Sequence, residues 1–181
     1  MKTTTAQLPG ILIVEPTVFQ DNRGFFFESY HQQLYQQHGI SVNFVQDNHS
    51  RSVKNTLRGL HYQINPGQDK LVRVIVGEVF DVAVDIRFGS PTFGKWFGVH
   101  LSAENKKQIF IPKGFAHGFC VISEVAEFEY KCSEFYSRND ERGIIWNDPD
   151  LGIDWPVKDP IVSDKDSKNL LFRQIGQDFK Y

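Results

Sequence analysis

The sequence lacks the features that would place the chain in a membrane or outside the cell. No apolar run approaches the roughly 20 residues that span a bilayer. Residues 1–11 also lack the charged and then apolar pattern of a signal peptide. We therefore expect a cytoplasmic protein with no membrane partner. The chain also has little net charge, −2 from 20 basic and 22 acidic residues. Because a nearly neutral chain has no overall field for polyanions, we expect no nucleic-acid partner.

Common catalytic and cofactor-binding motifs are missing too. The chain has no Gly-x-Gly-x-x-Gly, no P-loop and no Gly-x-Ser-x-Gly, which argues against a nicotinamide-binding Rossmann unit, a P-loop enzyme and a serine-hydrolase elbow. Its two cysteines, Cys120 and Cys132, are too far apart for a Cys-x-x-Cys motif and are interpreted as buried thiols. The six histidines show neither His-x-His nor His-Glu-x-x-His spacing. We therefore expect no metal site.

What the chain does have is aromatic residues and alternating patterns. Aromatic residues make up 14% of it, with 16 phenylalanines, which favours strands. Alternation around a turn at Gly77 predicts a β-hairpin over residues 71–87, and a second over 118–136 with its turn at Ser123 and Glu124. Shorter strands are predicted at 11–14, 25–29, 42–49, 57–63, 96–101 and 108–111. Many short strands indicate a sandwich or barrel. We expect one domain, residues 1–181.

Helix is predicted in only two places. Residues 30–38, closed by Gly39, have the length of about two turns. Ser163 and Asp166 have the spacing of a capping box that opens a short C-terminal helix. Capping alone would account for the Asp166 carboxylate.

Three side chains on predicted strands are candidates for chemistry, each with an ordinary alternative. His61 is a possible base in a barrel mouth, or a half-buried histidine satisfied by the backbone. Lys70 is in register with inward-facing valines, so it either meets an anion or extends to water. Tyr130 lies on an apolar face, where its phenol is either a core group or a proton donor.

Residues 21–28 combine charge with three consecutive phenylalanines. Arg23 and Glu28 could form an ordinary rim ion pair. Strand alternation places Phe25 and Phe27 on the face opposite Phe26. Both faces are then apolar, which suggests a strand buried at a subunit interface.

Several ordered motifs together resemble one family, that of dTDP-4-dehydrorhamnose 3,5-epimerase, from about residue 10 to 171. The motifs are Asp-x-Arg-Gly-Phe-Phe-x-Glu at 21–28, Phe-Val-Gln-Asp-Asn-His-Ser at 44–50, Leu-Arg-Gly-Leu-His-Tyr-Gln at 57–63, Lys-Leu-Val-Arg-Val at 70–74, Gly-Glu-Val-Phe-Asp-Val-Ala-Val-Asp-Ile-Arg at 77–87 and Ile-Pro-x-Gly-Phe-Ala-His-Gly-Phe at 111–119. The resemblance implies an all-β fold, a cupin-like double-stranded β-helix or jelly-roll barrel with a few short peripheral helices.

The resemblance also implies an isomerase that needs no cofactor. It would epimerise carbons 3 and 5 of a dTDP-4-keto-6-deoxy sugar through enolates, a step of dTDP-L-rhamnose synthesis. By the same resemblance His61 is the base, Asp166 its orienting carboxylate, Tyr130 the acid and Lys70 the cation near the carbonyl oxygen. The implied substrate-binding residues are Arg23, Phe26, Glu28, Gln46, Asp47, Asn48, Arg58, His117, Tyr136, Glu141 and Lys165, with Tyr136 stacking on the thymine.

The family is homodimeric, so the resemblance implies a homodimer, in agreement with the phenylalanine pattern. Three alternatives stay open from the sequence. The chain could be a mono-epimerase on a related dTDP-4-keto sugar, a non-catalytic cupin that binds a nucleotide sugar, or a metal-dependent cupin oxygenase. The presence of both His61 and Tyr130 argues against a pure binder, which needs no donor facing a base.

Overall fold

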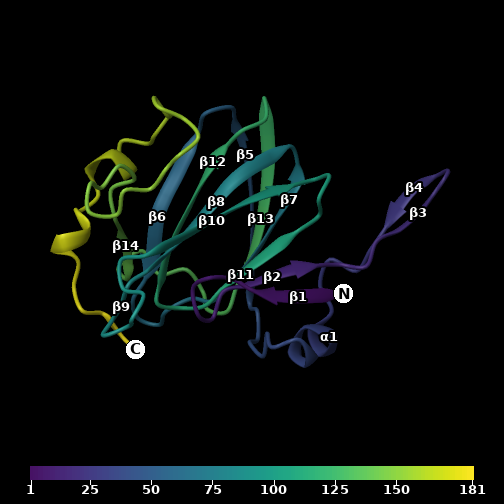
Figure 1. Cartoon of the computed structure of the whole chain (residues 1–181), viewed down its shortest axis with the longest axis horizontal. Coiled ribbons are helices and arrows are strands. Elements are labelled where there is room, and N and C mark those ends of the chain that lie inside the picture. Colours follow the sequence, from purple (N-terminus) through teal and green to yellow (C-terminus); the bar gives the residue numbers. More distant parts are fainter.

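A computed structural model describes all residues from Met1 to Tyr181, and two facing antiparallel sheets dominate it (Figure 1). The six-stranded sheet has the order β1-β2-β11-β7-β13-β5 and the five-stranded sheet the order β10-β8-β12-β6-β14. This confirms the expected all-β, cupin-type jelly roll. The strands of the first sheet are β1 Lys2–Thr5, β2 Leu12–Glu15, β5 Gln46–Val53, β7 Lys70–Val76, β11 Gln108–Ile111 and β13 Val125–Cys132; those of the second are β6 Leu57–Gln63, β8 Glu78–Asp85, β10 Trp96–Ser102, β12 Phe115–Val121 and β14 Glu141–Gly143.

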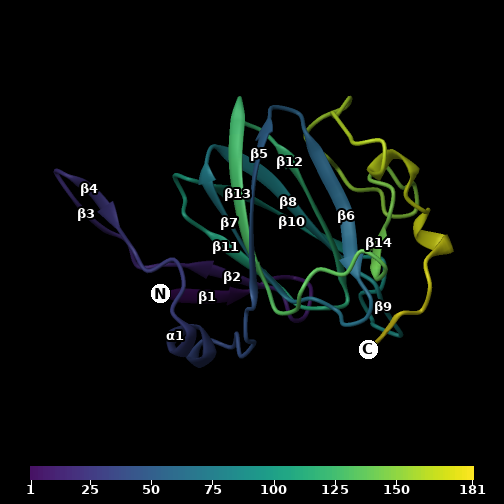
Figure 2. The same ribbon diagram turned by 180° about the vertical axis from the view of Figure 1, so that it is seen from behind.

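Small elements surround the sheets. A hairpin of β3 (Phe19–Asp21) and β4 (Gly24–Phe26) projects from the body, and Figure 2 shows it from behind. Helix α1 (Gln32–Gln37) falls inside the predicted helical segment. The short strands β9 (Arg87–Phe88) and β15 (Phe179–Lys180) pair in parallel near the C-terminus. The C-terminal segment has only 3₁₀ turns at Asp166–Lys168 and Phe172–Gln174. No helix is long and apolar enough to cross a membrane.

Both predicted hairpins are wrong in their pairing, although their strands are present. Strand β7 pairs with β11 and β13, whereas β8 pairs with β10 and β12 in the other sheet. Strands β12 and β13 also separate between the two sheets. At the two corners the Ser123 hydroxyl accepts from the backbone N–H of Glu78 and donates to the carbonyl of Val125. Alternation around a short turn does not tell a paired strand from one that crosses to the facing sheet.

The main core lies between the two sheets. Val72 and Phe128 contribute from the six-stranded sheet, and Ala83 and Phe119 from the five-stranded sheet. The outer face of the five-stranded sheet is covered as well, where Trp155 packs with other C-terminal side chains. Strand β8 is therefore buried on both faces, which explains why its apolar residues do not alternate cleanly.

Strands β6 and β12 approach closely where two glycines meet. Gly59 has a φ of +126°, and a Cβ there would lie 2.5 Å from the Cα of Gly118. We expect Gly59→Ala to lower the free energy of unfolding by about 2–4 kcal/mol, because backbone strain and a clash add. Urea unfolding measures the loss. Gly89→Ala is the matched control, since Gly89 also has a positive φ, +88°, but open space around its Cβ position. An equal loss in both variants would contradict the close-packing argument.

Candidate functional site

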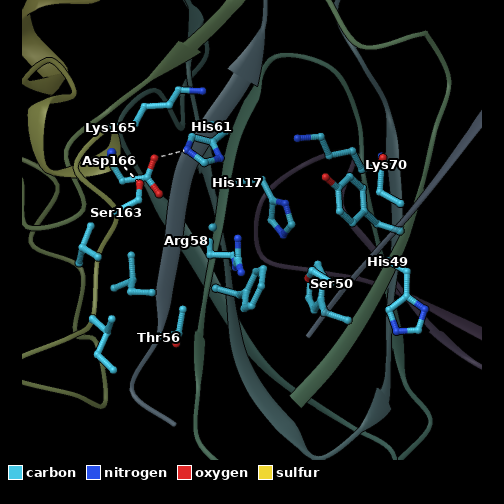
Figure 3. Close-up of a pocket in the computed structure, with 18 residues that line it drawn as sticks. His49, Ser50, Thr56, Arg58, His61, Lys70, His117, Ser163, Lys165 and Asp166 are labelled. Carbon is cyan, nitrogen blue, oxygen red and sulfur yellow. Dashed lines mark hydrogen bonds and ion pairs between the residues drawn. The ribbon is translucent and has the colours of Figure 1, made fainter. Parts of the chain in front are cut away.

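A cavity of about 650 Å³ opens between the two sheets (Figure 3). It continues into a smaller one of about 180 Å³, and His61, Lys70, Asn48 and Tyr130 line both. His61 comes from β6 in one sheet, whereas Lys70 and Tyr130 come from β7 and β13 in the other. The cavity therefore has a histidine on one wall and a phenol and an amine on the opposite wall.

His61 is held by a buried carboxylate. Its Nε2 donates to Oδ1 of Asp166 at 2.6 Å, and Oδ2 of Asp166 accepts from the backbone N–H of Gly59 at 3.3 Å. Burial raises the pKa of Asp166, but its hydrogen bonds and the nearby His61 more than offset this, so the pKa lies below its usual value. Asp166 therefore stays ionised and fixes the ring, which leaves Nδ1 of His61 as the nitrogen available to a ligand.

Only half of the predicted capping box forms. The hydroxyl of Ser163 accepts from the backbone N–H of Asp166 at 3.1 Å. The Asp166 side chain does not return this bond, because it turns toward His61 instead (Figure 3). The turn at Ser163 thus positions the carboxylate. The predicted C-terminal helix is wrong, because a single 3₁₀ turn, Asp166–Lys168, forms at this point instead.

The opposite wall carries a protonated phenol beside a half-buried amine. Burial raises the pKa of Tyr130 to about 12, so its hydroxyl keeps its proton at neutral pH. The Nζ of Lys70 lies 5.9 Å from the centre of the Tyr130 ring. Burial lowers the pKa of Lys70, and the nearby Cys132, Asp81 and Glu141 act in the opposite direction. This wall can donate a proton and place a positive charge close to it.

Further polar side chains from the predicted set surround the cavity. Arg58 and His117 both line the cavity, and Nε of Arg58 donates to the hydroxyl of Ser52. Gln46 donates to Asn48 from the same face of β5. At the smaller cavity the hydroxyl of Tyr136 donates to Glu141, which also pairs with Lys165.

Four residues of the predicted set do not reach the cavity within this chain. Arg23 pairs with Asp21 in the projecting hairpin, Phe26 lies on that hairpin and Glu28 follows it, exposed. Asp47 pairs with Lys131 on the outer face of β5, because strand alternation turns it away from Gln46 and Asn48.

The sequence analysis also missed residues that the structure brings to the site. Asp81 is fully buried behind His117, and Phe119 and Phe128 are among the apolar residues of the cavity wall. The sequence signal for Asp81 is a charged residue at a core-facing position of a strand whose two faces are both apolar. The structure has no group of three or more His, Cys, Asp or Glu side chains that could hold a metal ion.

Comparisons with known proteins agree on one family. The family model described as dTDP-4-dehydrorhamnose 3,5-epimerase matches residues 5–174. The enzyme of that name from Shigella flexneri is 61% identical over 174 residues, which cover 95% of this chain and 96% of the relative. The crystal structure of dTDP-6-deoxy-D-glucose-3,5-epimerase from Legionella pneumophila, in complex with dTDP-4-keto-L-rhamnose, superposes with a TM-score of 0.96 at 50% identity, covering 99% of this chain and 98% of that one.

A more distant neighbour has a narrower activity. ChmJ, a 3'-monoepimerase from Streptomyces bikiniensis solved with dTDP-quinovose, superposes with a TM-score of 0.88 at 34% identity, covering 93% of this chain and 86% of that one. The family model and the more similar relatives carry the double-epimerase name over nearly the whole chain. The chain belongs to the dTDP-4-dehydrorhamnose 3,5-epimerase family and is an epimerase, hence an isomerase, of dTDP-L-rhamnose synthesis.

Proposed function

We propose that the cavity between the sheets epimerises carbons 3 and 5 of dTDP-4-dehydro-6-deoxy-D-glucose, with His61 as base and Tyr130 as acid. The observation that carries this proposal is the His61–Asp166 pair on one wall of the cavity, facing Tyr130 and Lys70 on the other wall. Inversion at carbon requires proton removal from one face and proton delivery to the other. The two walls supply those two groups.

The keto group at carbon 4 makes the chemistry possible. When the C–H bond at carbon 3 or carbon 5 breaks, the proton passes to Nδ1 of His61 and the electron pair moves to the carbonyl oxygen. The resulting enolate is stabilised by the ammonium of Lys70. Tyr130 then protonates the carbon from the opposite face as the carbonyl re-forms, which leaves His61 protonated and Tyr130 as a phenolate. His61 then releases its proton to solvent and Tyr130 takes one up, so the same arrangement can act on the second carbon that flanks the ketone. All atoms and charges balance without a redox step.

The remaining polar groups fit a nucleoside diphosphate. Arg58 places guanidinium donors on the cavity wall, which suits diphosphate oxygens, and His117 lines the same wall. Tyr136 is exposed beside the smaller cavity, where its ring is free to stack on a base. The Legionella relative binds dTDP-4-keto-L-rhamnose, which supports this assignment. We also propose a cytoplasmic location, a reading supported by the free, buried Cys120 and Cys132.

Proton NMR of the chelated protein with dTDP-4-dehydro-6-deoxy-D-glucose in deuterium oxide tests the function. We expect deuterium at both carbons 3 and 5, and L-rhamnose after coupled reduction. Exchange at a single carbon would instead identify a mono-epimerase. No exchange despite binding would favour a non-catalytic cupin, and activity only after metal is restored would favour the metal-dependent alternative.

We further propose a homodimer in which each β3–β4 hairpin lies against the partner. Phe19, Phe25 and Phe26 are 62%, 58% and 67% exposed in the single chain, and an isolated two-stranded hairpin is marginally stable in water. The same contact would carry Arg23 and Glu28 toward the partner's cavity. This contact accounts for Arg23 and Glu28, two predicted binding residues that do not reach the cavity within one chain.

Sedimentation analysis tests the dimer. We expect a double Phe25→Ser, Phe26→Ser variant to be a monomer with reduced turnover, because it removes the apolar surface that the hairpin buries. Phe88→Ser is the matched control, since Phe88 is also exposed but lies on β9. A dimer that survives the double substitution would contradict the proposed interface.

A further inference from the structure

Asp81 is a carboxylate in the core between the sheets with a single bonding partner. It is fully buried, and both of its oxygens accept from Nε2 of His117, at 2.9 and 3.0 Å. No other group of the chain donates to it. The His117 ring stacks with Phe128, and Phe119 stacks on Phe128 in turn. A charge in such apolar surroundings is costly unless a cation accompanies it.

Asp85 shows what a purely structural carboxylate looks like in the same place. It lies four residues further along β8, on the same face, and is equally buried. Arg87 pairs with it, and the hydroxyls of Ser90 and Thr92 also donate to it. Its bonding capacity is thus filled by neighbours that are remote from the cavity. Asp81 has no such set, and its one partner lines the cavity.

The Asp81–His117 pair also differs from the Asp166–His61 pair. The backbone N–H of Gly59 donates a hydrogen bond to Oδ2 of Asp166, so the Asp166 carboxylate does not depend on His61 alone. Asp81 depends on His117 for every hydrogen bond that it makes. His117 is thereby fixed by Nε2, and its Nδ1 makes no hydrogen bond within the chain. The two histidines face the same cavity on neighbouring strands (Figure 3).

Asp81 lies behind the cavity wall that faces the amine of Lys70, because its partner His117 lines the same cavity as Lys70. Burial favours the neutral form of Lys70 and lowers its pKa, and the groups that oppose this effect are Cys132 when it is ionised, Asp81 and Glu141. The side-chain amine of Lys70 makes no hydrogen bond within the chain. The titratable and charged groups that line the two cavities with Lys70 are His49 on β5, Arg58, His61 and Tyr62 on β6, His117 on β12, Tyr130 and Cys132 on β13, Glu141 on β14, and Tyr136, Lys165 and Asp166 outside the two sheets; Asp81 on β8 lies behind His117. Burial raises the pKa of both Tyr130 and Cys132, so neither adds a negative charge at neutral pH.

We propose that Asp81 is a positioning residue of this site: it holds the His117 ring at the cavity wall and is the buried counter-charge that keeps Lys70 an ammonium group. A buried ion pair is a poor source of stability, whereas an enolate needs a cation that survives burial. This inference rests on the proposed function, because the ammonium matters only where negative charge develops on the ligand.

Asp81→Asn tests the charge with little change of shape, since the amide oxygen still accepts from Nε2 of His117. Without the carboxylate, Lys70 loses its proton at lower pH. We expect the alkaline limb of the kcat profile to move down by about one pH unit, a tenfold loss of turnover on that limb, with little change at lower pH. Asp85→Asn is the matched control. It removes an equally buried charge from the same strand. We expect it to lower the free energy of unfolding without shifting the alkaline limb of the kcat profile.

Competitive labelling of Lys70 with acetic anhydride, read by mass spectrometry across pH, tests the same inference without substrate. We expect acetylation of Lys70 to begin at lower pH in Asp81→Asn than in the unchanged protein. This measurement stays decisive if the protein does not epimerise the proposed sugar, so the two proposals fail separately. Should Asp81→Asn not fold, Asp81→Glu keeps the charge and is expected to keep the labelling profile. Unchanged labelling in Asp81→Asn, an equal shift in Asp85→Asn, or a shift in Asp81→Glu would overturn the inference.

Discussion

His61→Asn is expected to lose about 10³-fold in turnover while it still binds dTDP. The loss follows from removing the group that takes the proton, which is worth about 10²–10⁴-fold in general base catalysis. Asparagine keeps a polar group near Asp166 but accepts no proton at neutral pH. Because Asp166 is buried and held by Gly59 and Ser163, we expect the loop to stay in place. Calorimetric binding of dTDP together with coupled turnover measures the separation.

His100→Asn is the control for this substitution. His100 pairs with Glu78 on an exposed surface outside the cavity, so the same change there is expected to leave turnover intact. Full activity in His61→Asn would mean that the base has been wrongly assigned. His117 would then be the candidate to test, because its Nδ1 also lacks a partner within the chain.

The sequence predicted the strands of this fold far better than their partners. The predicted range 57–63 matches β6, and 108–111 matches β11. The pairing of β7 with β8 and of β12 with β13 was wrong because both connections are corners between sheets. Local alternation reports which side chains share a face, and it carries no information about which distant strand supplies the hydrogen bonds. In a jelly roll those partners are remote in sequence.

The candidate site was predictable to the extent that its residues belong to recognisable motifs. Folding brings together four residues that are distant in the sequence: His61, Lys70, Tyr130 and Asp166. The family resemblance had already grouped them. The sequence analysis missed Asp81 because β8 is apolar on both faces, so the alternation pattern alone does not identify the Asp81 position as core-facing.

Tyr130→Phe is expected to separate proton exchange from inversion. The substitution removes one oxygen, and the remaining ring keeps its contacts with Phe128 and its place beside Lys70. Because the pKa of Tyr130 is raised to about 12, the phenol is a proton donor throughout the neutral range. Without it, we expect product formation to fall by about 10²–10³-fold. His61, still 30% exposed, continues to remove protons and to exchange them with solvent.

In deuterium oxide this variant is therefore expected to return substrate that carries deuterium without inverted configuration, because the enolate is reprotonated from the His61 side. Proton NMR gives exchange and inversion in one sample. Tyr35→Phe is the control, since Tyr35 is a buried tyrosine bonded to Gln108 away from the cavity, and it is expected to keep the wild-type ratio of the two. Exchange and inversion that fall in parallel would show that Tyr130 supports the whole reaction rather than the second proton transfer. Inversion at the wild-type rate would place the acid elsewhere on the six-stranded wall.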